Sequence, residues 1–143
     1  MASVARSAPY DTDYPSEDVS TATGWIAFAA ILLGISGAWN VFDGILAIAK
    51  SRVYAPNQTY VFSDLRTWGW IVLILGTLEI VAAVMLFGGS AFARWFGVGA
   101  ASLNAIGQLM FIPAQPFWAL AMFSLDLLVI YALVVYGGRL DEA

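Results

Sequence analysis

Two carboxyl side chains, Glu79 and Asp126, lie inside long apolar stretches of the sequence. Ionisable residues in a membrane-spanning helix are costly to bury and commonly mark proton or ion sites. No Lys, Arg or His is expected at their depth to neutralise them. Because burial disfavours the charged form, we expect one or both groups to be protonated. They would then be hydrogen-bonded to each other or to Asn104.

These two carboxyl groups and Asn104 are expected at one level of the membrane. Counting 1.5 Å per residue from the tryptophan at the start of each helix places Glu79 and Asp126 about 13 and about 12 Å below one surface. The same count places Asn104 about 16 Å below that surface. Three more polar residues are predicted to step upward from this level toward the loop that joins the first two helices: Gln108, Asn40 and Asp43.

One face of the third apolar stretch combines small and polar residues. The residues that share it at helical spacing are Gly97, Ala101, Asn104, Ala105 and Gln108. Small residues let membrane helices approach closely, and polar side chains can bond across them. We therefore expect this face to point into a helix bundle, toward Glu79 and Asp126.

Three interpretations of the polar residues remain open. They could form an interhelical hydrogen-bond network that only fixes the packing. They could line a cavity that opens on the loop side and binds a proton, a cation or a small polar head group. One carboxylate could instead face a partner subunit. Trp39, next to Asn40, could line such a cavity or belong to the ordinary core.

The elements that would position these residues are four apolar helices. The chain has 143 residues, of which 61% are hydrophobic and 11% charged, an apolar excess for a soluble domain of this size. Four runs are long enough to cross a bilayer, and short links make neighbours antiparallel. We predict an all-α integral membrane protein, an antiparallel four-transmembrane-helix bundle, with helices at about 23–49, 67–87, 91–112 and 116–137.

Two segments lie outside these helices. Residues 1–22 are small, polar and acidic, which predicts a flexible tail. Residues 51–66 contain two short β-prone runs, at 53–54 and 60–62, on either side of the turn-like sequence Pro56-Asn57-Gln58. They predict a small extramembrane β-hairpin between the first two helices.

Tryptophans favour the two membrane–water interfaces. Five of the six fall near the start of a predicted helix and are interpreted as interface anchors: Trp25, Trp68, Trp70, Trp95 and Trp118. The basic residues do not decide the orientation, because each side carries three: Arg6, Arg94 and Arg139 on one, and Lys50, Arg52 and Arg66 on the other. The acidic tail favours cytoplasmic termini.

The sequence lacks the residue types that most catalytic mechanisms use. The chain has no cysteine and no histidine, and it shows no phosphate-binding glycine loop or metal-ligand spacing. We therefore expect no metal, no cofactor and no enzyme activity. The net charge of −4 would repel nucleic acid, which is not expected as a partner.

Several separated motifs resemble a known family. They are Trp-Asn-Val-Phe-Asp-Gly at 39–44, Thr-Trp-Gly-Trp-Ile at 67–71, Phe-Ile-Pro-Ala-Gln-Pro at 111–116 and the run at 125–133. Together they are similar to an uncharacterised family of small four-helix membrane proteins from actinobacteria, a domain of unknown function. The resemblance implies a bacterial plasma membrane and supplies no activity. Members often carry a histidine near the place where Val72 stands here.

The leading functional hypothesis is an accessory or scaffold protein that self-associates or joins a larger membrane complex. Its partners would be the lipid bilayer and other membrane subunits. The first alternative is a proton- or cation-coupled small transporter that uses Glu79 and Asp126, which requires a water-accessible carboxylate. The second is a lipid- or quinone-binding protein that uses Trp39, which requires an opening of lipid width.

Overall fold

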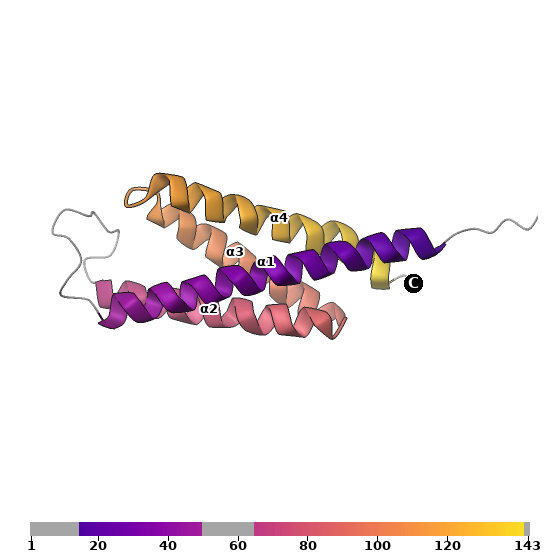
Figure 1. Cartoon of the computed structure of the whole chain (residues 1–143), viewed down its shortest axis with the longest axis horizontal. Coiled ribbons are helices and arrows are strands. Elements are labelled where there is room, and N and C mark those ends of the chain that lie inside the picture. The colour runs from indigo at the N-terminus through magenta and orange to yellow at the C-terminus, as the bar shows by residue number, and fades with distance from the viewer. Residues whose placement is uncertain (1–14, 50–64, 142–143) are drawn as a thin grey trace, which may run out of the picture.

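The computed structural model describes residues 15–49 and 65–141, and these form a bundle of four helices. They are α1 (Pro15–Ala49), α2 (Leu65–Phe87), α3 (Ala91–Phe111) and α4 (Pro116–Asp141). Each packs against two neighbours, in the pairs α1–α2, α2–α3, α3–α4 and α1–α4, so α1 and α3 lie diagonally across the bundle, as do α2 and α4 (Figure 1). The predicted four-helix, all-helical architecture is confirmed.

The predicted β-hairpin between the first two helices is wrong. The described residues contain helices and no strand, and Leu65 and Arg66, which the prediction placed in the hairpin, begin α2. The rest of that segment, 51–64, lies outside the described residues. The physical reason is that its two runs are short and lack polar–apolar alternation, and an isolated two-stranded hairpin is marginally stable in water.

The first helix begins earlier than the sequence suggested. α1 starts at Pro15, whereas the prediction placed the start near residue 23. Proline is tolerated at the first position of a helix because its nitrogen needs no partner there. With 35 residues, α1 is about 52 Å long, so it exceeds the roughly 30 Å of hydrocarbon in a bilayer. Residues 1–14 of the predicted tail lie outside the described residues.

Three of the described helices are long and apolar enough to cross a membrane. They are α1 over Val19–Ala49, α2 over its whole length and α4 over Pro116–Arg139. The third helix, α3, is not among them, because it carries Arg94 near its start and Asn104 and Gln108 along one face. That face is the predicted one, and the structure buries all five of its residues against the other helices.

Paired glycines bring the backbones of α1 and α2 together. A Cβ atom added to Gly37 would lie 2.7 Å from the carbonyl oxygen of Gly76, and one added to Gly76 would lie 2.6 Å from that of Gly37. Seven residues along each helix, Gly44 and Gly69 repeat the arrangement, with approaches of 2.8 and 3.0 Å. Small residues permit such close packing of membrane helices, so these two pairs define the α1–α2 hairpin.

Below the middle of the bundle, toward the chain termini, the helices enclose an apolar core. Its members come from all four helices and include Ala30 and Leu33 on α1, Leu86 on α2, Ala101 on α3 and Leu133 on α4. All five are at most 5% exposed. This layer closes the bundle on the side of the termini.

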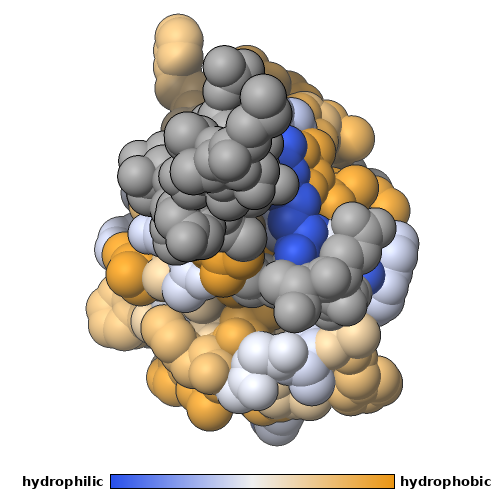
Figure 2. Space-filling model, turned by 90° about the vertical axis from the view of Figure 1, so that its right-hand side faces the viewer, coloured by the Kyte–Doolittle hydropathy of each residue, from blue (hydrophilic) through white to orange (hydrophobic). Residues whose placement is uncertain are grey.

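The outer surface is largely apolar. Figure 2 looks onto the end where α1 begins and α4 ends, and apolar residues form most of the perimeter there, with hydrophilic residues gathered in one area. Of the tryptophans predicted as interface anchors, Trp25 and Trp95 lie toward this end, and Trp68, Trp70 and Trp118 lie toward the other. Trp68 is buried against the other helices rather than exposed to lipid.

Candidate functional site

Each of the four helices places one polar side chain at the same level in the centre of the bundle. They are Asn40 on α1, Glu79 on α2, Asn104 on α3 and Asp126 on α4. The Nδ2 atom of Asn40 donates to Oε2 of Glu79 at 3.0 Å and to Oδ1 of Asn104 at 2.7 Å. The Nδ2 atom of Asn104 donates to Oδ2 of Asp126 at 2.9 Å. The asparagines thus lie on one diagonal and the carboxyl groups on the other.

Ser36 completes this polar layer. Its hydroxyl group donates to Oε1 of Glu79 at 3.5 Å and accepts from Nδ2 of Asn104 at 3.4 Å. An asparagine amide carries two hydrogens and a serine hydroxyl one. All five of these hydrogens are therefore directed at partners inside the layer. The layer is a closed and directional network, of the kind that fixes one packing arrangement.

The two carboxyl groups of the layer are sealed from the surroundings. Glu79 is 0% and Asp126 1% exposed, and the apolar core lies directly beneath them. Among the described residues, their hydrogen-bond partners are neutral amide or hydroxyl groups. Within the described ranges, no three His, Cys, Asp or Glu residues come together in a way that could hold a metal ion.

The sequence located three members of this layer and missed part of it. Glu79, Asn104 and Asp126 were predicted at one depth, and the structure joins them in one network. Asn40 was predicted nearer the surface, yet it lies at the centre of that network. Ser36 was not singled out, although it precedes Asn40 by four residues and therefore shares its helix face. This four-residue spacing is the sequence feature that could have placed Ser36 in the layer.

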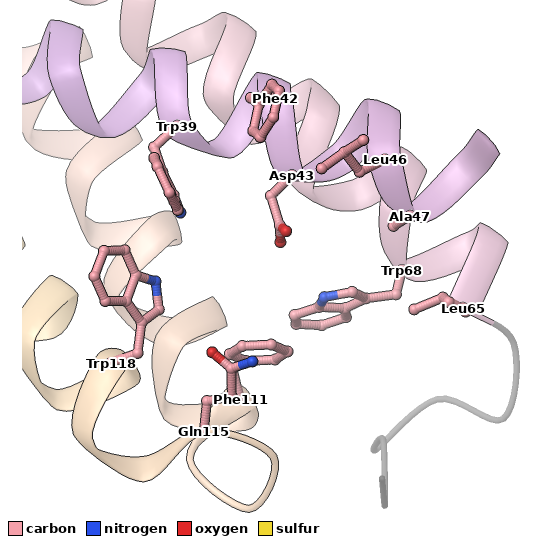
Figure 3. Close-up of a pocket in the computed structure, with 10 residues that line it drawn as sticks. All are labelled: Trp39, Phe42, Asp43, Leu46, Ala47, Leu65, Trp68, Phe111, Gln115 and Trp118. Atoms are coloured by element: carbon pink, nitrogen blue, oxygen red, sulfur yellow. The ribbon is translucent and has the colours of Figure 1, made fainter. Parts of the chain in front are cut away.

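Above the polar layer, at the end where α1 finishes and α2 begins, the helices enclose a pocket of about 340 Å³. All four helices contribute to its wall, through Trp39 and Asp43 of α1, Trp68 of α2, Phe111 of α3 and Trp118 of α4 (Figure 3). The volume falls in the range of known small-molecule sites. The lining combines aromatic rings with a single carboxyl group among the described residues.

A second, smaller cavity continues from this pocket into the bundle. It measures about 30 Å³ and shares Trp39, Asp43 and Trp118 with the pocket above it. Its inner wall includes Asn40 and Asn104 of the polar layer. A space of this size holds about one water molecule. Gln108 also lines the smaller cavity. Of the six polar residues singled out from the sequence, Glu79 and Asp126 are the two that line neither cavity.

Two aromatic pairs border the pocket on opposite sides. The ring centroids of Trp39 and Trp118 lie 5.2 Å apart with the rings tilted by 49°. Those of Trp68 and Phe111 lie 5.8 Å apart, and the rings are stacked at 6°. The carboxyl group of Asp43 points into the space between the pairs (Figure 3). Trp39, which the sequence left as either cavity wall or core, lines the pocket and is 46% exposed.

A family comparison covers most of this bundle. Residues 25–138 match the family described as "Domain of unknown function (DUF7144)". The chain belongs to this family. The matched range includes the whole polar layer and both walls of the aromatic pocket, and excludes the first turns of α1. No curated protein and no solved structure matches the chain.

Proposed function

We propose that this protein binds a small amphipathic molecule, of the lipid or quinone class, in the aromatic pocket at the loop end of its membrane bundle. The observation that supports the proposal is the pocket itself, about 340 Å³ in volume and lined by all four helices. Trp39 and Trp118, which border it from α1 and α4, are each exposed over more than a third of their surface. Both rings therefore offer apolar surface that an apolar chain leaving the pocket can contact on its way into the surrounding lipid.

The small cavity beneath the pocket supports a polar head on the ligand. It ends on Asn40 and Asn104, whose amide oxygens can still accept a hydrogen bond from a polar head group or a bridging water. The apolar core below closes the other side. The site is thus a blind pocket with a polar floor and aromatic walls, which is the usual composition of a small-molecule site.

This proposal has more structural support than the two rival functions. A proton- or cation-coupled transporter that uses Glu79 and Asp126 needs one of these two groups to be water-accessible, and neither cavity reaches them. An accessory or scaffold role in a larger complex fits the apolar exterior, but lipid alone covers such a surface equally well. An accessory role and ligand binding are compatible, and co-purification of partner subunits would test that role directly.

We also infer that all four helices lie in the membrane. The third helix, α3, is 21 residues or about 32 Å long, and its polar face is turned into the bundle, so its outer face can meet lipid. The proposed location is a bacterial plasma membrane with both chain termini in the cytoplasm. The N-terminal end of α1 and the C-terminal end of α4 lie on the same side of the bundle (Figure 1).

Filling the pocket tests the proposed function. Leu46→Trp adds bulk to a residue that lines the pocket. Leu120→Trp is the matched control, because Leu120 is 49% exposed and lines neither the pocket nor the smaller cavity beneath it. Each protein is purified in an uncharged detergent, and the small molecules that remain bound are extracted and identified by mass spectrometry. A compound retained by wild type and Leu120→Trp but lost from Leu46→Trp supports the proposal, and identical extracts from all three contradict it.

A further inference from the structure

The pocket holds one charged group and several aromatic rings, and this combination indicates the chemistry of the ligand's head. Asp43 is the only carboxyl group that lines the pocket within the described chain, and it is half-buried there. Among the described residues, no Lys or Arg lines either cavity. Among the described residues, no side chain forms a hydrogen bond or ion pair with Asp43, so its oxygens remain available to a ligand.

From this arrangement we propose that the ligand carries an organic ammonium head group, held by Asp43 and the surrounding aromatic rings. This inference rests on the proposed function of the same pocket. A carboxylate in a partly desolvated site attracts a cation more strongly than it would in water. Tryptophan faces attract cations as well, and aromatic enclosures bind quaternary ammonium groups through this effect.

The placement of the rings fits such a head group. Trp39 and Trp118 border the space on one side, Trp68 and Phe111 border it on another, and the Asp43 carboxyl group enters between them (Figure 3). An ammonium head seated there contacts the carboxylate and at least one ring face. Its alkyl chain can pass Trp39 and Trp118 toward the lipid, since both are partly exposed.

An anionic head group is opposed by the same observations, because Asp43 would repel it and the lining offers no cationic side chain in the described chain. A head without charge would offer Asp43 no counter-charge, so its binding would require either desolvation of the carboxylate or its protonation. The ammonium could belong to a single-chain amine or to a zwitterionic phospholipid. The shared chemistry is the cationic nitrogen attached to an apolar chain.

The test compares two probes with the same alkyl chain. Purified protein in uncharged detergent micelles is titrated with decyltrimethylammonium and, separately, with decyl glucoside, and saturable binding is followed by tryptophan fluorescence and calorimetry against empty micelles. We expect decyltrimethylammonium to bind at least about tenfold more tightly than decyl glucoside, a difference of the size that a charge-assisted contact gives.

Variants assign the preference to the pocket. Asp43→Asn should remove the tenfold preference, whereas Asp43→Glu keeps the charge and should retain most of it. Trp118→Leu should weaken binding of the ammonium probe more than Trp118→Phe does, because only the latter keeps an aromatic face. Thr77→Val removes a hydroxyl group that bonds only to Leu73 of its own helix, so this variant should bind both probes as wild type does. Equal loss of both probes in Asp43→Asn would overturn the inference, since Asp43 would then only shape the pocket.

The outcomes separate this inference from the proposed function. If both probes bind equally and Leu46→Trp blocks both, the pocket binds ligands but does not select ammonium, and this inference alone fails. If neither probe binds saturably and the extracts of wild type and Leu46→Trp are identical, both proposals fail. Phosphatidylcholine added to the micelles distinguishes the sources, because competition with decyltrimethylammonium assigns the site to a lipid head group and lack of competition assigns it to a single-chain amine.

Discussion

The amide nitrogen of Asn40 donates a 2.7 Å hydrogen bond to the amide oxygen of Asn104, and this bond crosses the diagonal of the bundle from α1 to α3. Each asparagine also binds one carboxyl group of its own helical hairpin, Asn40 that of Glu79 and Asn104 that of Asp126. The α1–α2 and α3–α4 hairpins are therefore joined at their polar centre by this bond. It lies between the apolar core and the aromatic pocket.

Replacing Asn104 by leucine should destabilise the bundle by about 1–3 kcal/mol. The change removes three hydrogen bonds from the buried layer, including those to Asn40 and Asp126, and buried polar groups left without partners carry the full desolvation cost. Reversible unfolding in mixed micelles with increasing dodecyl sulfate measures the difference.

The matched control for that change is Ser124→Ala, which removes an exposed hydroxyl group that bonds only within its own helix. Its stability should stay within about 0.5 kcal/mol of wild type, as is usual for surface substitutions. Equal stabilities for Asn104→Leu and wild type would show that the polar layer does not stabilise the bundle.

Replacing Gly37 by alanine should destabilise the α1–α2 hairpin by about 1–3 kcal/mol, the usual cost of overpacking. The new Cβ atom would lie 2.7 Å from the carbonyl oxygen of Gly76, so the two backbones must move apart. The same unfolding titration gives the magnitude.

Gly99→Ala provides a control of opposite sign. No atom lies within 4 Å of a Cβ atom added at that position, and alanine favours a helix over glycine by up to about 1 kcal/mol. This variant should be as stable as wild type or more so. Similar destabilisation by both changes would mean that loss of glycine itself, rather than the close helix approach, is responsible.

The double variant Glu79→Gln and Asp126→Asn should insert into the membrane and assemble as wild type does. Each substitution keeps the shape of the side chain, and a neutral carboxyl group and a carboxamide can both accept and donate in the same network. Membrane fractionation and size-exclusion chromatography in detergent check the result. Failure to insert or assemble would show that the carboxyl groups themselves are structural requirements of the layer.

The orientation can be tested with single cysteines, because the chain has none of its own. We expect Asn57→Cys in intact bacterial cells to react with a membrane-impermeant maleimide, and Gly138→Cys to react only after the cells are permeabilised. A Cβ atom added at Gly138 meets no atom within 4 Å, so a cysteine there fits the structure. The reverse labelling pattern would place the termini outside the cell.

The sequence by itself determined the four helices and much of the polar layer. Long apolar runs have few alternatives to a helix where water is absent, because every backbone polar group must be satisfied within the segment. The fixed rise per residue of a helix then placed Glu79, Asn104 and Asp126 at one predicted depth. Local signals were weaker outside the apolar runs, and this explains both the early start of α1 and the incorrect hairpin.

Only the tertiary structure decided which side chains meet. Helix spacing gives the depth and face of Asn40, but its bonds to Glu79 and Asn104 depend on how α1 rotates and how closely it packs, which the glycine pairs with α2 control. The pocket has the same origin. Trp39 and Trp118 are 79 positions apart in the sequence, and their rings meet because α1 and α4 are neighbours. Such contacts arise from the packing of whole helices, and no local pattern in the chain encodes them.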